Sequence, residues 1–195
     1  MTGLPGAAGD AVLVPMRWWH LPEVMELELE LFGAESWSEA AFWSELAEPE
    51  TRHYVVAMRR PAGPGGPAGP GGPAGLAGSI GPGGSGGPET GVSAVPDAQS
   101  GGVVGYAGLA VYHDEGHVLT LGVTGSAQGC GIGAALLTNL LAAAERRGAM
   151  RVLLDVRSDN KVAQRLYQRH GFTPIGIRRR YYQPSGIDAV VMRRG

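Results

Sequence analysis

The sequence is poor in cysteine and in long apolar runs. Cys130 is the single cysteine among 195 residues, which excludes an intrachain disulfide and a zinc site built from paired cysteines. No stretch approaches the roughly 18 apolar residues that cross a bilayer, and the first residues lack a basic start followed by an apolar run. We therefore expect neither a membrane span nor a signal peptide, but a soluble cytoplasmic protein in a reducing compartment, with no membrane partner.

Glycine and proline are in excess, with 33 Gly and 14 Pro in the chain. Between Pro61 and Gly102, 16 Gly and 8 Pro occur among 42 residues, with no lysine or arginine and almost no bulky side chain. Such a segment buries too little apolar surface to offset the entropy lost on ordering it, so we predict a disordered insertion over residues 61–102. The remaining length is that of one domain, so we predict a single domain over residues 1–195.

The formal net charge of −2 conceals an uneven distribution. Residues 1–60 carry ten acidic residues and four arginines, whereas residues 103–195 carry six acidic and twelve basic residues. A basic C-terminal half suits an anionic ligand, and an acidic N-terminal half suits a basic partner. Arginine makes up fifteen of the sixteen basic residues, as in a GC-rich genome, so codon usage explains the distribution equally well.

Apolar periodicity and end signals predict a mixed α/β chain, whose central strand–helix–strand unit is flanked by antiparallel pairs. Ser38 is predicted as a helix N-cap, and Gly33, Gly148 and Gly171 as helix ends. The predicted helices are Leu21–Phe32, Ser38–Ala47, Gly131–Arg147 and Asn160–His170. The predicted strands are Ala11–Met16, Arg52–Arg59, Val103–Tyr112, His117–Val123, Arg151–Val156, Phe172–Ile177 and Ala189–Met192.

A glycine-rich turn, Gln128-Gly129-Cys130-Gly131-Ile132-Gly133, joins a strand ending at Val123 to a helix. Glycines let backbone N–H groups approach an anion, and a helix N-terminus adds unpaired donors, so the turn indicates pyrophosphate binding. A turn without a ligand is the plainer alternative. A dinucleotide pattern also fits, with Asp155 on a ribose, although five residues separate the strand from the first glycine. No Lys-Ser/Thr pair follows the glycines, which excludes a Walker A loop.

The same turn matches the Q/R-x-x-G-x-G/A motif of the GNAT acetyltransferases. The stretch Asp155–Asn160, then Leu166-Tyr167 and Gly171-Phe172, resembles the second half of that superfamily's core. Further matches at Ser36–Glu39, Arg178–Tyr182 and Asp188-Ala189 narrow the resemblance to RimI-type ribosomal-protein-alanine N-acetyltransferases. It covers residues 12–60 and 103–193. It implies an α/β GNAT fold: a mixed, mostly antiparallel sheet with a splayed central parallel pair, flanked by helices.

The resemblance also implies roles for individual residues. Asn160 would contact the pantetheine arm of acetyl-CoA, the co-substrate, and Tyr167 would protonate the departing CoA thiolate. Asp155 stands where the family usually has a glutamate as general base. The strand end would offer backbone groups to acetyl-CoA, one of them polarising the thioester carbonyl, through Leu121, Gly122 and Val123. The pyrophosphate would be cradled by Gly129, Cys130, Gly131, Ile132, Gly133 and Ala134.

Aspartate at position 155 departs from the family pattern. It is one methylene shorter than glutamate, and a carboxyl with an ordinary pKa of about 3.9 is a weak base. A weak base can still serve, because on the order of a tenth of N-terminal α-amines are already neutral at pH 7. Positioning of the amine can then supply most of the rate. A purely structural role remains open for both residues. Asp155 could form an ion pair with Arg157 or Arg151, and Tyr167 could be an aromatic residue of the core. Cys130 is read as a small side chain beside a phosphate rather than an acetylated nucleophile.

The resemblance implies acetyl transfer, by direct attack in a ternary complex, to the N-terminal alanine of the eighteenth protein of the small ribosomal subunit. Such a basic acceptor suits the acidic N-terminal half. We expect no direct nucleic-acid contact and no metal, since no His/Cys/Asp cluster has ligand spacing. Three alternatives stay open: a GNAT enzyme for a lysine or a polyamine, a non-catalytic acetyl-CoA-binding module, and a dinucleotide-binding protein.

Overall fold

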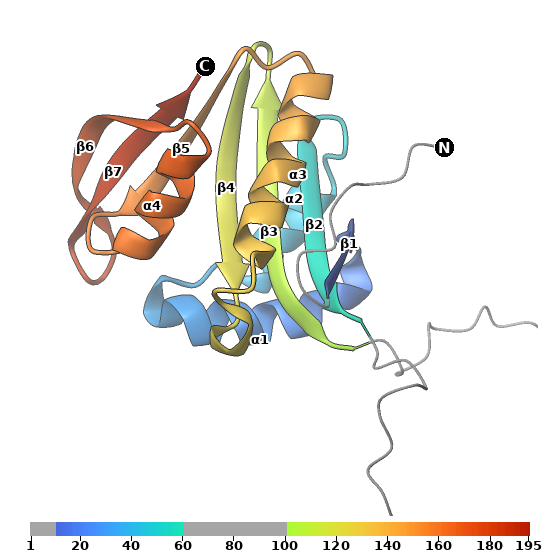
Figure 1. Ribbon diagram of the computed structural model, residues 1–195. Coiled ribbons are helices and arrows are strands. Elements are labelled where there is room, and N and C mark those ends of the chain that lie inside the picture. Colours follow the sequence, from blue (N-terminus) through green and yellow to red (C-terminus); the bar gives the residue numbers. More distant parts are fainter. Residues whose placement is uncertain (1–10, 61–100) are drawn as a thin grey trace, which may run out of the picture.

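The structure, a computed structural model, describes residues 11–60 and 101–195. The predicted insertion therefore lies outside the described residues, apart from Gly101 and Gly102. Figure 1 shows the described helices and strands. The helices are α1 (Leu21–Phe32), α2 (Glu39–Leu46), α3 (Ile132–Arg146) and α4 (Lys161–Arg169). The strands are β1 (Ala11–Pro15), β2 (Arg52–Arg59), β3 (Val103–Tyr112), β4 (Glu115–Val123), β5 (Arg151–Arg157), β6 (Thr173–Tyr182) and β7 (Ile187–Arg194). Short 3₁₀ turns cover Trp18–His20, Gly33–Glu35 and Gly125–Ala127.

The strands form one mixed sheet in the order β1-β2-β3-β4-β5-β7-β6, in which β4 and β5 are the parallel neighbours. Their pairing runs from Glu115↔Arg151 to Val118↔Leu154 and stops there. Beyond that point both strands continue, β4 to Val123 and β5 to Arg157, and Figure 1 shows them diverging. The predicted fold class, a mostly antiparallel sheet with a splayed central parallel pair, is confirmed.

A β-bulge in β4 accounts for the position of the splay. On β3, Leu109 pairs with Val118 and Gly108 pairs with Thr120, so Leu119 is an extra residue without a partner on β3. A bulge bends its strand and increases the local twist. Because Leu119 directly follows the last residue of β4 that pairs with β5, the bend turns the rest of β4 away from β5.

Two apolar layers cover the sheet, one on each face. In Figure 1, α3 and α4 lie in front of the sheet, and α1 and α2 lie behind it. β3 is buried along nearly its whole length, as expected for a central strand covered on both sides. The α3 layer includes Leu136, Leu137 and Leu140 of α3, and the α1 layer includes Leu21 and Val24 of α1. The periodicity of Gly131–Arg147 predicted the inward face of α3, which the structure confirms.

The predicted helix ends hold, whereas the last two strands are longer than predicted. The Ser38 hydroxyl accepts a hydrogen bond from the Ala41 N–H at 3.2 Å, and Gly33 ends α1 with φ of +55°. β6 continues five residues past its predicted end at Ile177, and β7 starts before its predicted beginning at Ala189. In the added part of β6, Arg178 and Tyr182 pair with β7, and the register is irregular between them. The added residues of β6 are arginine and tyrosine and carry no apolar alternation that would have predicted a strand.

The hairpin between β3 and β4 is also tighter than predicted. β4 begins at Glu115, two residues before the predicted start, and Tyr112 pairs with Glu115 across the turn. His113 in this turn has φ of +54°, a left-handed conformation. The mixed sheet differs from the doubly wound parallel sheet of dinucleotide-binding domains, so the fold speaks against the dinucleotide alternative.

Candidate functional site

A cavity of about 130 Å³ lies where β4 and β5 separate. Side chains from both apolar layers line this cavity, because the gap between the separated strands connects the two faces of the sheet. The α1 side contributes Glu28, Phe32, Glu35 and Trp37; the strands contribute Val118–Leu121, Leu154–Arg157 and Tyr182; the α4 side contributes Asn160, Ala163 and Tyr167. A ligand entering from one face can therefore meet a ligand entering from the other.

Asp155 reaches the cavity from the α1 side of the sheet. Side chains alternate along β5, and its neighbours Leu154 and Val156 are buried in the α3 layer. The Asp155 side chain is 22% exposed, and its Oδ1 atom is buried without a hydrogen bond. The Arg178 Nε atom lies 3.5 Å from that oxygen.

The two arginines that the sequence suggested as partners of Asp155 are engaged elsewhere. Arg157 forms ion pairs with Glu35 and Asp159, and Arg151 pairs with Glu115 at 2.6 Å. That alternative reading of Asp155 is therefore wrong, and its cationic neighbour comes from β6 instead.

Tyr167 reaches the same cavity from α4, on the opposite face of the sheet. Its ring packs edge-on against Phe172 at a centroid distance of 5.9 Å, so Tyr167 belongs to the core as well as to the cavity wall. Burial raises the pKa of its hydroxyl to about 12. The hydroxyl therefore keeps its proton at neutral pH and can act as a donor.

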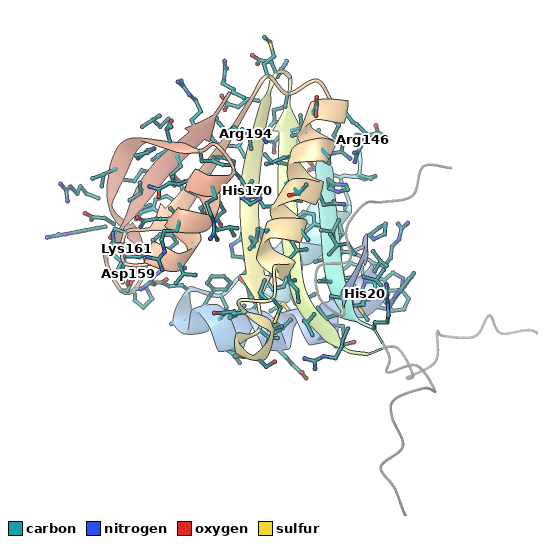
Figure 2. The ribbon with its side chains drawn as sticks, viewed as in Figure 1. His20, Arg146, Asp159, Lys161, His170 and Arg194 are labelled. Atoms are coloured by element: carbon teal, nitrogen blue, oxygen red, sulfur yellow. The ribbon has the colours of Figure 1, made fainter. Side chains whose placement is uncertain are left out.

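Asn160 caps α4 and also lines the cavity. Its Oδ1 atom accepts a hydrogen bond from the Ala163 N–H at 3.0 Å, which satisfies one of the free donors at the helix start. The side-chain amide NH₂ group has no acceptor among the described residues and can donate to a ligand. Asp159 and Lys161 lie beside this helix start (Figure 2), where Lys161 donates to the Ser158 carbonyl at 2.6 Å.

The glycine-rich turn before α3 has the geometry of an anion cradle. Gly129 and Gly131 have φ of +78° and +82°, which L residues with side chains rarely adopt, and Gly131 is the N-cap of α3. The first intrahelical bond of α3 runs from the Ala135 N–H to the Gly131 carbonyl. The amides of residues 132–134 therefore lack intrahelical acceptors, and the helix dipole adds partial positive charge there. This turn fits a pyrophosphate.

Other atoms of the turn hold it in place. The Gln128 side chain donates to the Val123 carbonyl at 3.0 Å and so ties the turn to the end of β4. Cys130 is exposed, with its Sγ atom 3.8 Å from the Gln128 carbonyl, in keeping with a small side chain at the rim of the turn. A Cβ atom on Gly133 would lie 3.4 Å from Leu166, at ordinary van der Waals distance, so α3 and α4 are close neighbours at this position.

The end of β4 offers a free strand edge beside the cavity. Leu121, Gly122 and Val123 pair with β3 on one side and have no β5 partner on the other. Backbone groups that point toward β5 are therefore available to a ligand. Gly122 has no room for a side chain, because a Cβ atom there would lie 2.8 Å from the Tyr106 ring.

Glu28 is a cavity residue that sequence reasoning missed. It is 1% exposed and accepts hydrogen bonds from the Trp37 N–H, at 2.9 Å, and from the Tyr106 hydroxyl. Burial raises its pKa to about 7. A signal was present, because Glu28 occupies a position of α1 that continues the apolar face of Leu21 and Val24.

Glu35 also went unnoticed in the sequence. Its carboxylate accepts hydrogen bonds from the Arg157 guanidinium and the Ser185 hydroxyl. It thereby connects the turn after α1 with β5 and with the turn between β6 and β7, and closes one side of the cavity. No local pattern singles out this glutamate, because both partners are distant in sequence.

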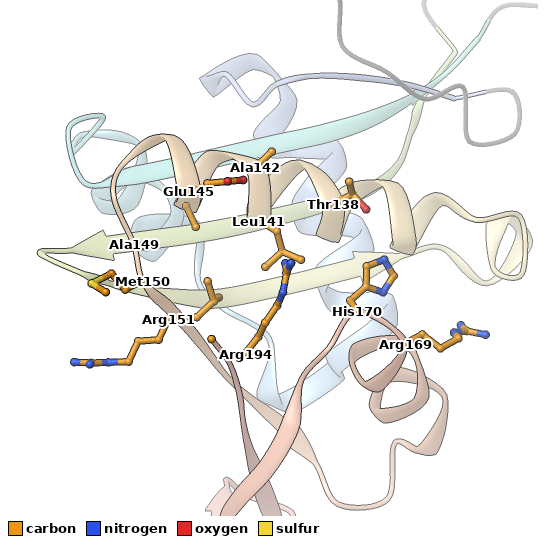
Figure 3. Close-up of a pocket in the computed structure, with 13 residues that line it drawn as sticks. Thr138, Leu141, Ala142, Glu145, Ala149, Met150, Arg151, Arg169, His170 and Arg194 are labelled. Atoms are coloured by element: carbon orange, nitrogen blue, oxygen red, sulfur yellow. The ribbon is translucent and has the colours of Figure 1, made fainter.

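A second cavity, of about 650 Å³, lies between α3 and the C-terminal ends of α4 and β7 (Figure 3). It shares no lining residue with the first cavity and contains none of the predicted site residues. In Figure 3 the Arg194 side chain extends from β7 toward α3. Within residues 11–60 and 101–195, no group of three or more His, Cys, Asp or Glu side chains is arranged to hold a metal ion.

Comparison with known proteins agrees with this geometry. The model of the acetyltransferase (GNAT) family matches residues 86–172. The N-alpha-acetyltransferase RimI of Mycobacterium tuberculosis is 38% identical over 87% of this chain and 82% of its own. A putative [ribosomal protein bS18]-alanine N-acetyltransferase of Bacillus subtilis is 24% identical over 91% of this chain and 90% of its own.

The fold is shared with a solved structure. The crystal structure of the ribosomal-protein-S18-alanine N-acetyltransferase from Escherichia coli superposes with a TM-score of 0.64 at 24% identity, covering 94% of this chain and 92% of that one. Splayed strands, an anion cradle at the start of α3 and a cavity through the sheet define an acyltransferase that takes its acyl group from a CoA thioester.

The chain belongs to the GNAT acetyltransferase family, and within it to the RimI-type N-alpha-acetyltransferases. Acetyl-CoA is the co-substrate that this family uses. Among the described helices, none has both the length and the apolar character needed to cross a membrane.

Proposed function

We propose that this protein acetylates the α-amine of the N-terminal alanine of ribosomal protein bS18 in the cytoplasm. The cavity that passes through the splayed sheet carries this proposal, since Tyr167 lines it from one face and Asp155 from the other. Such a cavity suits direct transfer, with the acetyl donor on the α3 side and the acceptor on the α1 side. The names of the relatives from B. subtilis and E. coli support bS18 as the acceptor.

Acetyl-CoA is proposed to bind along the α3 side. The free amides of residues 129–134 receive the pyrophosphate, and the positive end of the helix dipole stabilises its charge. The unpaired edge of residues 121–123 receives the pantetheine arm and directs one N–H at the thioester carbonyl, where negative charge develops during attack. The amide NH₂ group of Asn160 donates to the same arm.

The proposed reaction requires a neutral amine. Its nitrogen forms a bond with the thioester carbonyl carbon, and the C–S bond breaks. Asp155 accepts the proton that the nitrogen loses, directly or through a water molecule, and the Tyr167 hydroxyl donates a proton to the sulfur. Because positioning of the amine against the thioester supplies most of the rate, an aspartate suffices where the family usually has a glutamate.

The test is acetyl transfer to a peptide that carries the N-terminal sequence of bS18. Release of free CoA and the mass of one added acetyl group on the α-amine are measured together. Asp155→Asn and Tyr167→Phe should each lower kcat by about 10²-fold. Asp114→Asn and Tyr112→Phe are matched controls, because both residues lie outside the cavity and are about half exposed, and both should leave kcat unchanged. We expect EDTA to have no effect, since the proposed chemistry needs no metal.

The outcomes separate the alternatives. Transfer to lysine side chains or polyamines but not to the α-amine would replace the acceptor and keep the family chemistry. Tight CoA binding without turnover on any amine, unchanged in Asp155→Glu, would indicate a non-catalytic acetyl-CoA-binding module. Absence of CoA binding would overturn the proposal.

A further inference from the structure

The carboxylates of the cavity carry little uncompensated charge. Asp155 lies beside Arg178, and Glu35 forms an ion pair with Arg157. Glu28 is buried, which raises its pKa to about 7, so about half of it is uncharged at neutral pH. Tyr181 and Tyr182, which lie near Asp155, add no charge either, since tyrosine is neutral at this pH and burial raises the pKa of both hydroxyls further. A protonated amine that enters this cavity therefore loses its hydration and meets little negative charge that is not already paired or partly neutralised by a proton.

Three consecutive arginines, Arg178–Arg180, lie on β6, and Arg178 is the one that approaches Asp155 in the cavity. Arg179 forms an ion pair with Asp188 at 2.6 Å, and the Arg180 N–H donates to the same carboxylate at 2.9 Å. Arg178 instead crosses β7 and approaches Asp155 on β5. The Arg178 guanidinium also lies over the Tyr181 ring, 5.4 Å from its centroid. Arg178 is therefore oriented by two contacts, one with Asp155 and one with Tyr181.

We propose that Arg178 is a specificity-determining residue, whose positive charge offsets that of Asp155 where the acceptor arrives, so that the site admits neutral amines and disfavours ammonium ions. The inference rests on the proposed function, because it concerns the amine acceptor of that site. Without Arg178, the Asp155 carboxylate would attract the protonated amine, which has no lone pair with which to attack the thioester.

This device favours α-amines over lysine side chains. At pH 7 about one in seven α-amines is neutral, against about one in 2,500 lysine side chains, because their ordinary pKa values are about 7.8 and 10.4. A site that selects the neutral form therefore selects the N-terminus by its charge as well as by its shape.

The test compares two peptides that differ in charge alone. Both carry the acceptor sequence, one with a trimethylammonium group and one with an isosteric tert-butyl group in place of the terminal amine. Calorimetry in the presence of CoA gives the ratio of their dissociation constants for the wild type, Arg178→Gln, Arg178→Lys and Arg179→Gln. Because no turnover is needed, this measurement is independent of the activity assay.

We expect the wild type to bind the neutral peptide at least as tightly as the cationic one. Arg178→Gln should shift the ratio by roughly tenfold toward the cationic peptide, allowing for solvent screening of a guanidinium that is half exposed. Arg178→Lys should restore the wild-type ratio because it restores the charge. Arg179→Gln, which removes a charge already paired with Asp188, should behave as the wild type.

An unchanged ratio in Arg178→Gln would overturn the inference, and acetylation of the bS18 peptide by the wild type would then leave the proposed function standing. Conversely, a shifted ratio in a protein that acetylates no α-amine would support the role of Arg178 and contradict the proposed function. Failure of the wild type to bind either peptide would overturn both.

Discussion

Replacing Glu28 with glutamine removes an ionisable group from the buried face of α1 while keeping the shape of the side chain. Burial raises the pKa of Glu28 from 4.5 to about 7 in the folded protein. Between these values the folded protein binds more protons than the unfolded chain, so this group lowers the free energy of unfolding as the pH rises. Above pH 7 the loss is complete and amounts to about 3 kcal/mol, at about 1.4 kcal/mol for each unit of pKa shift.

Thermal unfolding of the wild type and Glu28→Gln, followed by circular dichroism between pH 5 and 8, tests this reasoning. Glutamine can still accept from the Trp37 N–H and can donate to the Tyr106 hydroxyl. We expect the Tm of the variant to rise relative to that of the wild type as the pH rises. At pH 8 the difference should have grown by about 6–12 °C for a chain of this size. Burial lowers the pKa of His20 and His53, but both histidines are common to the two proteins, so their contribution cancels in the comparison.

Parallel Tm curves for the two proteins across this range would refute the reasoning. They would mean that Glu28 ionises as readily in the folded protein as in the unfolded chain, and that the α1 face at this position is open to water.

Three further predictions concern stability and are checked by Tm. Gly122→Ala should destabilise the protein by about 1–3 kcal/mol, because its Cβ atom would press on the Tyr106 ring, whereas Gly176→Ala, with no atom within 4 Å of the new Cβ, should be nearly neutral. Replacing residues 63–100 with a short glycine-rich turn should leave Tm within a few degrees, since the end of β2 pairs with the start of β3; a large loss would contradict a passive insertion. Ser38→Ala should cost about 1 kcal/mol through loss of the α2 cap, and an unchanged Tm would show that the cap contributes nothing.

Much of the fold could be predicted from the sequence, because helices depend on residues within one or two turns. The apolar face of α3, the cap at Ser38 and the helix end at Gly33 each depend on residues close together in the chain. The structure confirms all three. The glycine-rich turn could be predicted equally well. Glycines followed by a helical apolar pattern indicate a helix N-terminus with unpaired N–H groups. The splayed sheet did not follow from these local features and was predicted only through the resemblance to GNAT enzymes. The assigned roles of Asp155 and Tyr167 stay predictions.

The tertiary structure alone revealed how distant residues meet. The bulge at Leu119 is defined by the register between β3 and β4, and the length of β6 is set by its pairing with β7. Sequence patterns offered Arg151 and Arg157 as partners of Asp155, because both are near it in the chain. Arg178 is the neighbour instead, since the order β5-β7-β6 brings it across one intervening strand. The sequence determined which segments are helix, strand and anion-binding turn; charge pairing in the cavity required the strand order, because side chains pair by distance in space.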